Sequence, residues 1–151
     1  MLYYAEHLKV THRRDLAKKR LEAIWIQIKF PSNSALFSVM YRSELESPNF
    51  FEDVYELLEK AWMKTSNMLL IGGKSMEKQT KAKKLLTLLQ LFKMHNVVKK
   101  ATRITPKTKF LIDLIVTTKP ELVRKTGVLL LGISDHSMIS SVFTFFDEIH
   151  C

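Results

Sequence analysis

The sequence predicts a single domain of the α/β class, in which β-strands and amphipathic helices alternate along the chain. Apolar residues recur with a period of two in some segments and with helical spacing in others. Hydrophobic residues make up 46% of the 151 residues, which is enough to build one substantial core. No internal repeat, low-complexity segment or Gly/Pro-rich linker divides the chain. We therefore expect residues 1–151 to form one domain.

The first third of the chain predicts a β-hairpin. Residues 23–30, AIWIQIKF, alternate between an apolar face and a face that carries Trp25, Gln27 and Lys29, which is typical of a half-buried strand. The PSNS that follows is turn chemistry, and ALFSVMYR at 35–42 predicts the second strand.

Two segments predict amphipathic helices on either side of a short strand. Residues 47–62 begin with Asn49 as the N-cap and acids in the first turns, followed by apolar residues at helical spacing. Residues 81–94 set leucines and Phe92 against a lysine-rich face that we expect to be solvated. Between them, NMLLI at 67–71 predicts a strand buried on both faces, which the GGKS at 72–75 ends. The apolar positions of these helices are Phe50, Val54, Leu57, Leu58 and Ala61, then Leu85, Leu86, Leu88, Leu89 and Phe92.

Three apolar runs in the last third predict strands: FLIDLIV at 110–116, GVLLLGI at 127–133 and SMISSVFTFF at 137–146. Asp113 interrupts the first run, and a carboxylate in a buried strand needs a hydrogen-bonded or charged partner. Asp135 and His136 stand side by side just before the third run. An imidazole such as that of His136 would serve as this partner.

The charge indicates the class of partner. Lysine and arginine number 24 against 15 acidic residues, a net charge of +9 that favours nucleic acid or an anionic membrane surface. A basic surface that only aids solubility remains an alternative. The single cysteine, Cys151, allows no internal disulfide, and the sequence has no signal-peptide core or run long enough for a membrane helix. We expect a soluble intracellular protein of the nucleus or cytoplasm, with no membrane partner.

The segment LLIGGKS is similar to a nucleotide-binding loop, but its spacing excludes that function. The loop needs a glycine five residues before the glycine of GKS, and that position is Met68. We therefore expect no nucleotide or other small-molecule cofactor.

The segments at 101–123 and 127–139, with SVMYRS at 38–43, resemble the endonuclease/exonuclease/phosphatase superfamily. The nearest branch is the endonuclease domain encoded beside the reverse transcriptase of retrotransposons that lack long terminal repeats. The resemblance spans about Leu21 to Val142. It implies a four-layered α/β sandwich, two mostly antiparallel sheets flanked by helices, and cleavage of DNA phosphodiesters that depends on Mg²⁺ or Mn²⁺.

Carried over by position, the resemblance implies a catalytic group. His136 of the SDH motif would contact the scissile phosphate, and Asp135 would take part in metal or water handling. Asp113 of the IDL strand would orient His136, because a carboxylate on one ring nitrogen fixes the tautomer and leaves the other nitrogen for a phosphate oxygen. Tyr41 would lie at the phosphate.

The resemblance also implies groups that bind the DNA backbone. Arg42 follows Tyr41, although Ser43 replaces the usual proline. Arg103 and Thr105 fall in the TR-x-T segment, which suits phosphate contacts. A loop salt bridge and a turn hydroxyl explain Arg103 and Thr105 equally well, and an ordinary solvent-facing strand end is the alternative for Tyr41 and Arg42.

The departures from the family predict a degenerate domain that is incomplete at its N-terminus. Gly73 and Ser75 replace the Asp and Asn of the family's Gly-Asp-Phe-Asn motif, and nothing before Leu21 resembles the segment with the metal-binding Glu. Asp135 remains as the one expected metal ligand, whereas Mg²⁺ usually needs one or two well-placed carboxylates. We expect weak or absent catalysis. The alternatives are a non-catalytic DNA-binding module and a non-functional mobile-element fragment with an unpaired sheet edge.

Overall fold

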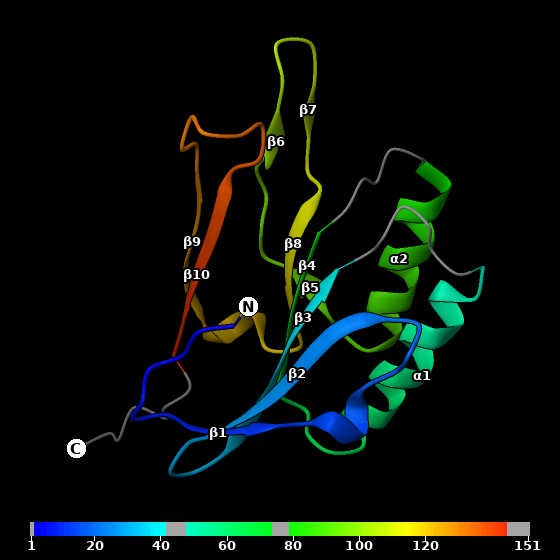
Figure 1. Ribbon diagram of the computed structural model, residues 1–151, viewed down its shortest axis with the longest axis vertical. Coiled ribbons are helices and arrows are strands. Elements are labelled where there is room, and N and C mark those ends of the chain that lie inside the picture. Colours follow the sequence, from blue (N-terminus) through cyan, green and yellow to red (C-terminus); the bar gives the residue numbers. More distant parts are fainter. Residues whose placement is uncertain (1, 42–47, 74–78, 145–151) are drawn as a thin grey trace.

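The larger sheet of the computed structural model has six strands, in the order β1-β2-β3-β4-β8-β5 (Figure 1). The structure describes residues 2–41, 48–73 and 79–144. Neighbouring strands are antiparallel except β3 and β4, which are parallel and are separated along the chain by helix α1. The strands are β1 (Lys9–His12), β2 (Glu22–Lys29), β3 (Ser34–Tyr41), β4 (Met68–Gly73), β8 (Asp113–Thr117) and β5 (His95–Asn96).

The predicted hairpin is confirmed as β2 and β3, which pair from Glu22 opposite Tyr41 to Lys29 opposite Ser34. The expectation of a half-buried β2 is wrong, because the middle of the strand is covered on both faces. Trp25 packs in the core beneath the helices, and Ile26 and Ile28 are buried on the opposite face. Burial on both faces follows from the position of the larger sheet in the middle of a sandwich.

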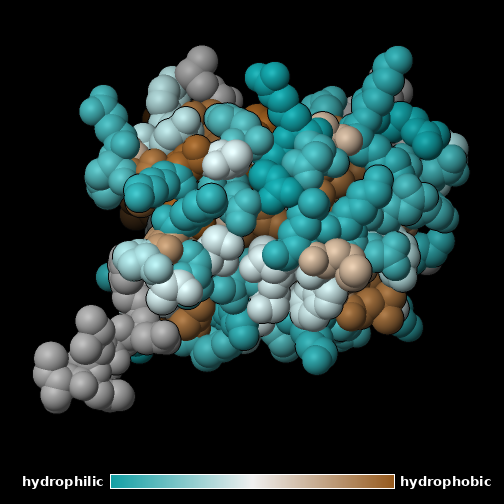
Figure 2. Space-filling model, turned by 90° about the horizontal axis from the view of Figure 1, so that it is seen from below, coloured by the Kyte–Doolittle hydropathy of each residue, from teal (hydrophilic) through white to brown (hydrophobic). Residues whose placement is uncertain are grey.

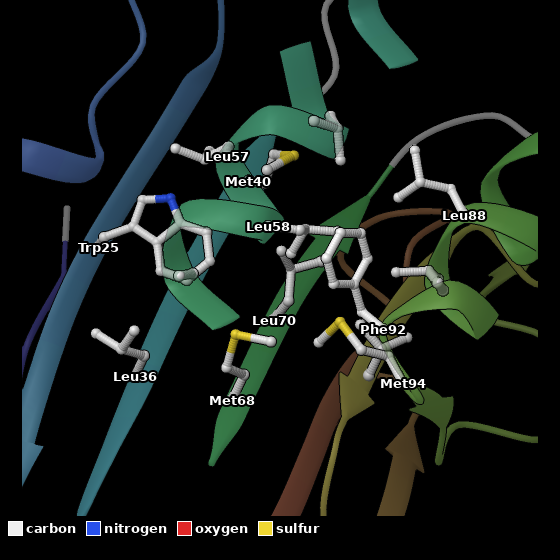
Figure 3. Packing of buried hydrophobic residues seen from close by; sticks show 14 of the residues in the cluster. Trp25, Leu36, Met40, Leu57, Leu58, Met68, Leu70, Leu88, Phe92 and Met94 are labelled. Atoms are coloured by element: carbon white, nitrogen blue, oxygen red, sulfur yellow. The ribbon is translucent and has the colours of Figure 1, made fainter. Parts of the chain in front are cut away.

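Both helices lie on one face of the larger sheet, α1 at Phe50–Trp62 and α2 at Gln79–Leu91 (Figure 1). All five predicted apolar positions of α1 are buried, and of those in the second helical segment Leu88, Leu89 and Phe92 are buried. Leu86, which we expected on the apolar face, is 46% exposed. Figure 3 shows the resulting core, in which Trp25, Met68 and Leu70 of the sheet meet Leu58 and Phe92.

A smaller sheet covers part of the other face of the larger sheet, formed by the antiparallel strands β9 (Val123–Leu129) and β10 (Met138–Phe143) (Figure 1). Val128, Ile139 and Phe143 pack there against Leu69 and Ile115. One helical layer and two sheets are therefore stacked, which confirms a mixed α/β sandwich. In the part of the chain that is described, no α-helix covers the outer face of the smaller sheet.

The predicted strand at 127–133 lies earlier in the chain than expected, because β9 spans Val123–Leu129. The strand ends at Leu129, Gly132 has a positive φ of 70° that turns the chain, and the apolar residues between and after them are exposed. The exposed residues are Leu129, Leu130, Leu131 and Ile133.

The predicted strand at 110–116 is divided in two. Residues Lys109–Phe110 form β7, which pairs with β6 (Arg103–Ile104) in a hairpin that projects beyond the sheets (Figure 1). The chain then enters the larger sheet as β8.

No helix of the described residues has the length and apolar character needed to cross a bilayer. The face in Figure 2 is mostly hydrophilic, with hydrophobic side chains visible between polar ones.

Candidate functional site

Three strands of the larger sheet bring their ends to one edge. Tyr41 is the last residue of β3, Gly73 the last of β4 and Asp113 the first of β8, and the register pairs Tyr41 with Gly73 and Gly73 with Asp113. Paired residues of neighbouring strands point to the same face of a sheet. The side chains of Tyr41 and Asp113 therefore flank a position, Gly73, that carries no side chain.

The loop before β10 places an imidazole against this edge. Nδ1 of His136 lies 3.2 Å from Oδ2 of Asp113, within hydrogen-bonding distance. The side chain of His136 is 49% exposed and that of Asp113 is 20% exposed. Among the described residues, no group hydrogen-bonds Nε2 of His136. The pair is thus tied at one nitrogen and presents the other to solvent.

Thr102, which the sequence analysis overlooked, connects the two halves of this pair. Its hydroxyl is fully buried and accepts the backbone N–H groups of Ile112 (3.1 Å) and Asp113 (2.9 Å). Its carbonyl accepts the N–H of Ser137, the residue after His136. The TR-x-T segment contains this residue, but nothing in the local pattern distinguishes its buried hydroxyl from that of an exposed threonine.

Arg103 and Asp135 form an ion pair beside the site. Nε of Arg103 lies 2.6 Å from Oδ2 of Asp135, and Arg103 also forms a β-bridge with His136. The hydrogen bond from the guanidinium, reinforced by its charge, lowers the pKa of Asp135 below the ordinary aspartate value. Asp135 is therefore an anion that Arg103 already partners.

Three other residues were predicted to contact phosphate, Tyr41, Thr105 and Arg42, and their surroundings differ. Tyr41 is 54% exposed at the sheet edge. The hydroxyl of Thr105 lies 2.7 Å from that of Thr108 and accepts the Thr108 N–H at 3.0 Å, so it stabilises the turn of the β6–β7 hairpin. Arg42 lies outside the described residues, as do Ser43 and Ser75.

The residues of the site do not fit a divalent metal ion. No group of three or more His, Cys, Asp or Glu side chains that could hold a metal occurs in the described ranges 2–41, 48–73 and 79–144. Each candidate carboxylate already has one oxygen bonded to a protein side chain, because Asp113 hydrogen-bonds His136 and Asp135 pairs with Arg103. The expected Mg²⁺ ligand Asp135 thus has a guanidinium where a cation would bind.

Comparison with known proteins defines the fold of this chain. No protein-family model matches the sequence, and no curated protein is significantly similar to it. Solved structures do match, and they show that the chain has the fold of the endonuclease/exonuclease/phosphatase proteins, as the resemblance implied. At 12–16% identity, this similarity establishes the fold alone.

One of these structures is the endonuclease domain of TRAS1, a telomere-specific non-LTR retrotransposon. The TM-score is 0.73 at 14% identity, and the match covers 93% of this chain and 70% of that domain. Another is the 3′-5′ exonuclease NExo from Neisseria meningitidis, with a TM-score of 0.62, 14% identity and coverage of 89% and 70%. A 3′ phosphatase NExo from Neisseria bound to a product DNA hairpin matches with a TM-score of 0.59, 12% identity and coverage of 93% and 71%.

Proposed function

We propose that this chain is a DNA-binding domain derived from a retrotransposon-type, metal-dependent endonuclease. It retains the groups that contact phosphate and has lost those that hold the metal, so it hydrolyses DNA slowly or not at all. The observation that carries the proposal is the Asp113–His136 pair, which stands half-exposed at the edge where β3, β4 and β8 end.

The geometry of the pair suits a phosphate oxygen. Asp113 accepts a hydrogen bond from Nδ1–H of His136, which orients Nε2 toward solvent. When the ring is protonated, Nε2–H donates a charge-assisted hydrogen bond to a phosphate oxygen. Tyr41, two strands away on the same face, contributes a hydroxyl that donates to the same or an adjacent phosphate.

The charge around the edge supports a polyanionic partner. Lys107 and Lys109 are exposed on the β6–β7 hairpin, which leads directly into Asp113. The net charge of +9 attracts DNA from a distance, and lysines that neutralise phosphates release counterions on binding. The TRAS1 domain and the DNA-bound NExo phosphatase, which share this fold, support DNA as the partner class.

The missing metal half supports binding over hydrolysis. Gly73 offers no carboxylate between Tyr41 and Asp113, and the carboxylate of Asp135 is paired with the guanidinium of Arg103 at 2.6 Å. Removing one member of a catalytic unit commonly lowers the rate by orders of magnitude. A residual nuclease is the second candidate function, supported by the intact Asp113–His136 pair.

Fluorescence anisotropy with a short DNA duplex tests the proposal. The affinity in EDTA should fall steeply between 50 and 200 mM salt, because each phosphate contact contributes about −0.9 to the slope of log K against log salt. His136→Gln should weaken binding about tenfold to a hundredfold, the range expected for one lost charge-assisted hydrogen bond of about 1.5–3 kcal/mol. His95→Gln is the matched control, since His95 is exposed on β5 opposite Thr117, at the far end of β8.

Nicking of supercoiled plasmid distinguishes the two candidate functions. With Mg²⁺ or Mn²⁺ we expect no more nicking by the wild type than by His136→Gln. Nicking that needs both the metal and His136 would establish the residual nuclease. A folded wild type with no salt-dependent affinity for DNA would refute DNA binding and leave the mobile-element fragment without function.

A further inference from the structure

Arg103 and His136 leave the backbone next to each other at the site. They stand opposite one another in an antiparallel β-bridge, and their neighbours form the backbone hydrogen bonds on either side of it, at 2.9 and 2.6 Å. The two residues therefore exchange no backbone hydrogen bond themselves. In such a pair the Cα atoms lie about 4.5 Å apart and both side chains point to the same face. The guanidinium and the imidazole thus project from one place in the same direction.

A carboxylate holds each of these two side chains in the same way. Oδ2 of Asp113 lies 3.2 Å from Nδ1 of His136, and Oδ2 of Asp135 lies 2.6 Å from Nε of Arg103. In both contacts the bonded nitrogen is the one nearer the backbone. A guanidinium has five N–H donors, of which the bond to Asp135 uses one. The side chains of Arg103 and His136 are 37% and 49% exposed, so a ligand in solvent can reach both.

We propose that Asp135 is a positioning residue for Arg103, so that Arg103 and His136 bind one phosphate of the DNA backbone together; the DNA part rests on the proposed function. The planar guanidinium donates two parallel hydrogen bonds to the phosphate, and Nε2–H of the imidazole donates a third. The loop salt bridge and the phosphate contact, which the sequence left as alternatives for Arg103, are then two parts of one arrangement.

Two effects of Asp135 on DNA binding have opposite signs. Its carboxylate repels a phosphate held nearby. By holding Nε, it also reduces the conformational entropy that the long arginine side chain loses when it binds. Removing the carboxylate therefore strengthens DNA binding if repulsion dominates and weakens it if positioning dominates. Our proposal requires the second outcome.

Fluorescence anisotropy with a short DNA duplex in EDTA measures this sign. Asp135→Ala should weaken binding about twofold to tenfold, the range for ordering one flexible side chain, although it makes the protein more positive. Asp135→Asn keeps an acceptor oxygen for the Nε–H and should recover most of the loss. An affinity of folded Asp135→Ala equal to or higher than that of the wild type would overturn the proposal.

The control variant is Asp15→Ala, which removes the acid of another exposed Arg–Asp pair. Asp15 lies 2.7 Å from Nη2 of Arg13 and 3.3 Å from Nζ of Lys64, in the segment that follows the edge strand β1. Its loss changes the net charge by the same amount without touching Arg103. The affinity of Asp15→Ala for DNA should equal or slightly exceed that of the wild type. A loss as large as that of Asp135→Ala would overturn the specific role of Asp135.

A double-mutant cycle links the two residues. Arg103→Gln should weaken DNA binding about tenfold to a hundredfold, because it removes charge-assisted hydrogen bonds. In the Arg103→Gln background Asp135→Ala should cause no further loss, since the side chain that it positions is absent. Losses that multiply would overturn the mechanism.

NMR relaxation of the arginine Nε–H groups tests the positioning without DNA. Arg103→Gln identifies the Arg103 signal, and Asp135→Ala should lower its ¹⁵N order parameter, whereas Asp15→Ala should leave it unchanged. An unchanged order parameter of Arg103 in folded Asp135→Ala would overturn the positioning role. If the wild type binds no DNA, the proposed function fails, while this measurement still decides whether Asp135 positions Arg103.

Discussion

Replacing Thr102 with valine tests how the site is held together. The two side chains have nearly the same shape, but valine lacks the hydroxyl that accepts the N–H groups of Ile112 and Asp113 at 3.1 and 2.9 Å. Thr102 is 0% exposed and Ile112 is 4% exposed, so water does not reach the Ile112 N–H without local opening. The change therefore leaves two backbone N–H groups at the start of β8 without a hydrogen-bond acceptor.

The cost follows from the burial of those donors. A buried donor without a partner costs about 1–3 kcal/mol, and the Asp113 N–H is only part-buried, so we expect Thr102→Val to lower the unfolding free energy by about 2–4 kcal/mol. Thr102→Ser keeps the hydroxyl and loses one methyl group, which costs about 0.8 kcal/mol. The hydroxyl, rather than the methyl group, should therefore dominate.

Urea denaturation measures the difference. With a slope of about 2 kcal/mol/M, the middle of the usual range for urea, the midpoint of Thr102→Val should fall by roughly 1–2 M, and the slope should not change. Thr117→Val is the matched control at the other end of β8, because the buried hydroxyl of Thr117 accepts one N–H, that of Lys119 at 3.1 Å. A Thr102→Val midpoint equal to that of Thr102→Ser or Thr117→Val would refute the reasoning.

Two further predictions concern the Arg103–Asp135 ion pair and strand β10. Because Arg103 lowers the pKa of Asp135 on folding, their pair stabilises the chain above the unfolded pKa of Asp135 and is lost as the pH falls through the folded pKa. The small Tm gap between the wild type and Asp135→Asn at pH 7 should close in acid and in high salt; a gap that persists at low pH contradicts this assignment. Strand β10, Met138–Phe143, pairs only with β9 among the described residues and has no charge or proline, so Val142→Lys, at a position 56% exposed, should slow aggregation measured by light scattering; unchanged aggregation would exclude the β10 edge as the contact.

The local elements of the larger sheet could be predicted because their periodicity reports burial directly. The β2–β3 hairpin and helix α1 occur where alternation and helical spacing place them, since each pattern matches one repeat of the backbone. The last third was harder to predict. The run at 127–133 is apolar throughout, and composition cannot indicate whether another layer covers a strand. In the described structure Val128 packs against the larger sheet, whereas Leu130 and Ile133 face solvent.

The sequence by itself determined the types of element, the basic charge and the resemblance that led to Asp113 and His136 as a pair. The tertiary structure decided the partners of the polar groups. It paired Asp135 with Arg103, buried the hydroxyl of Thr102 against the start of β8, and placed Asp113 beside Gly73. The physical reason is distance along the chain: propensity and periodicity act over a few residues, whereas these contacts join segments up to 40 residues apart through strand register and loop closure.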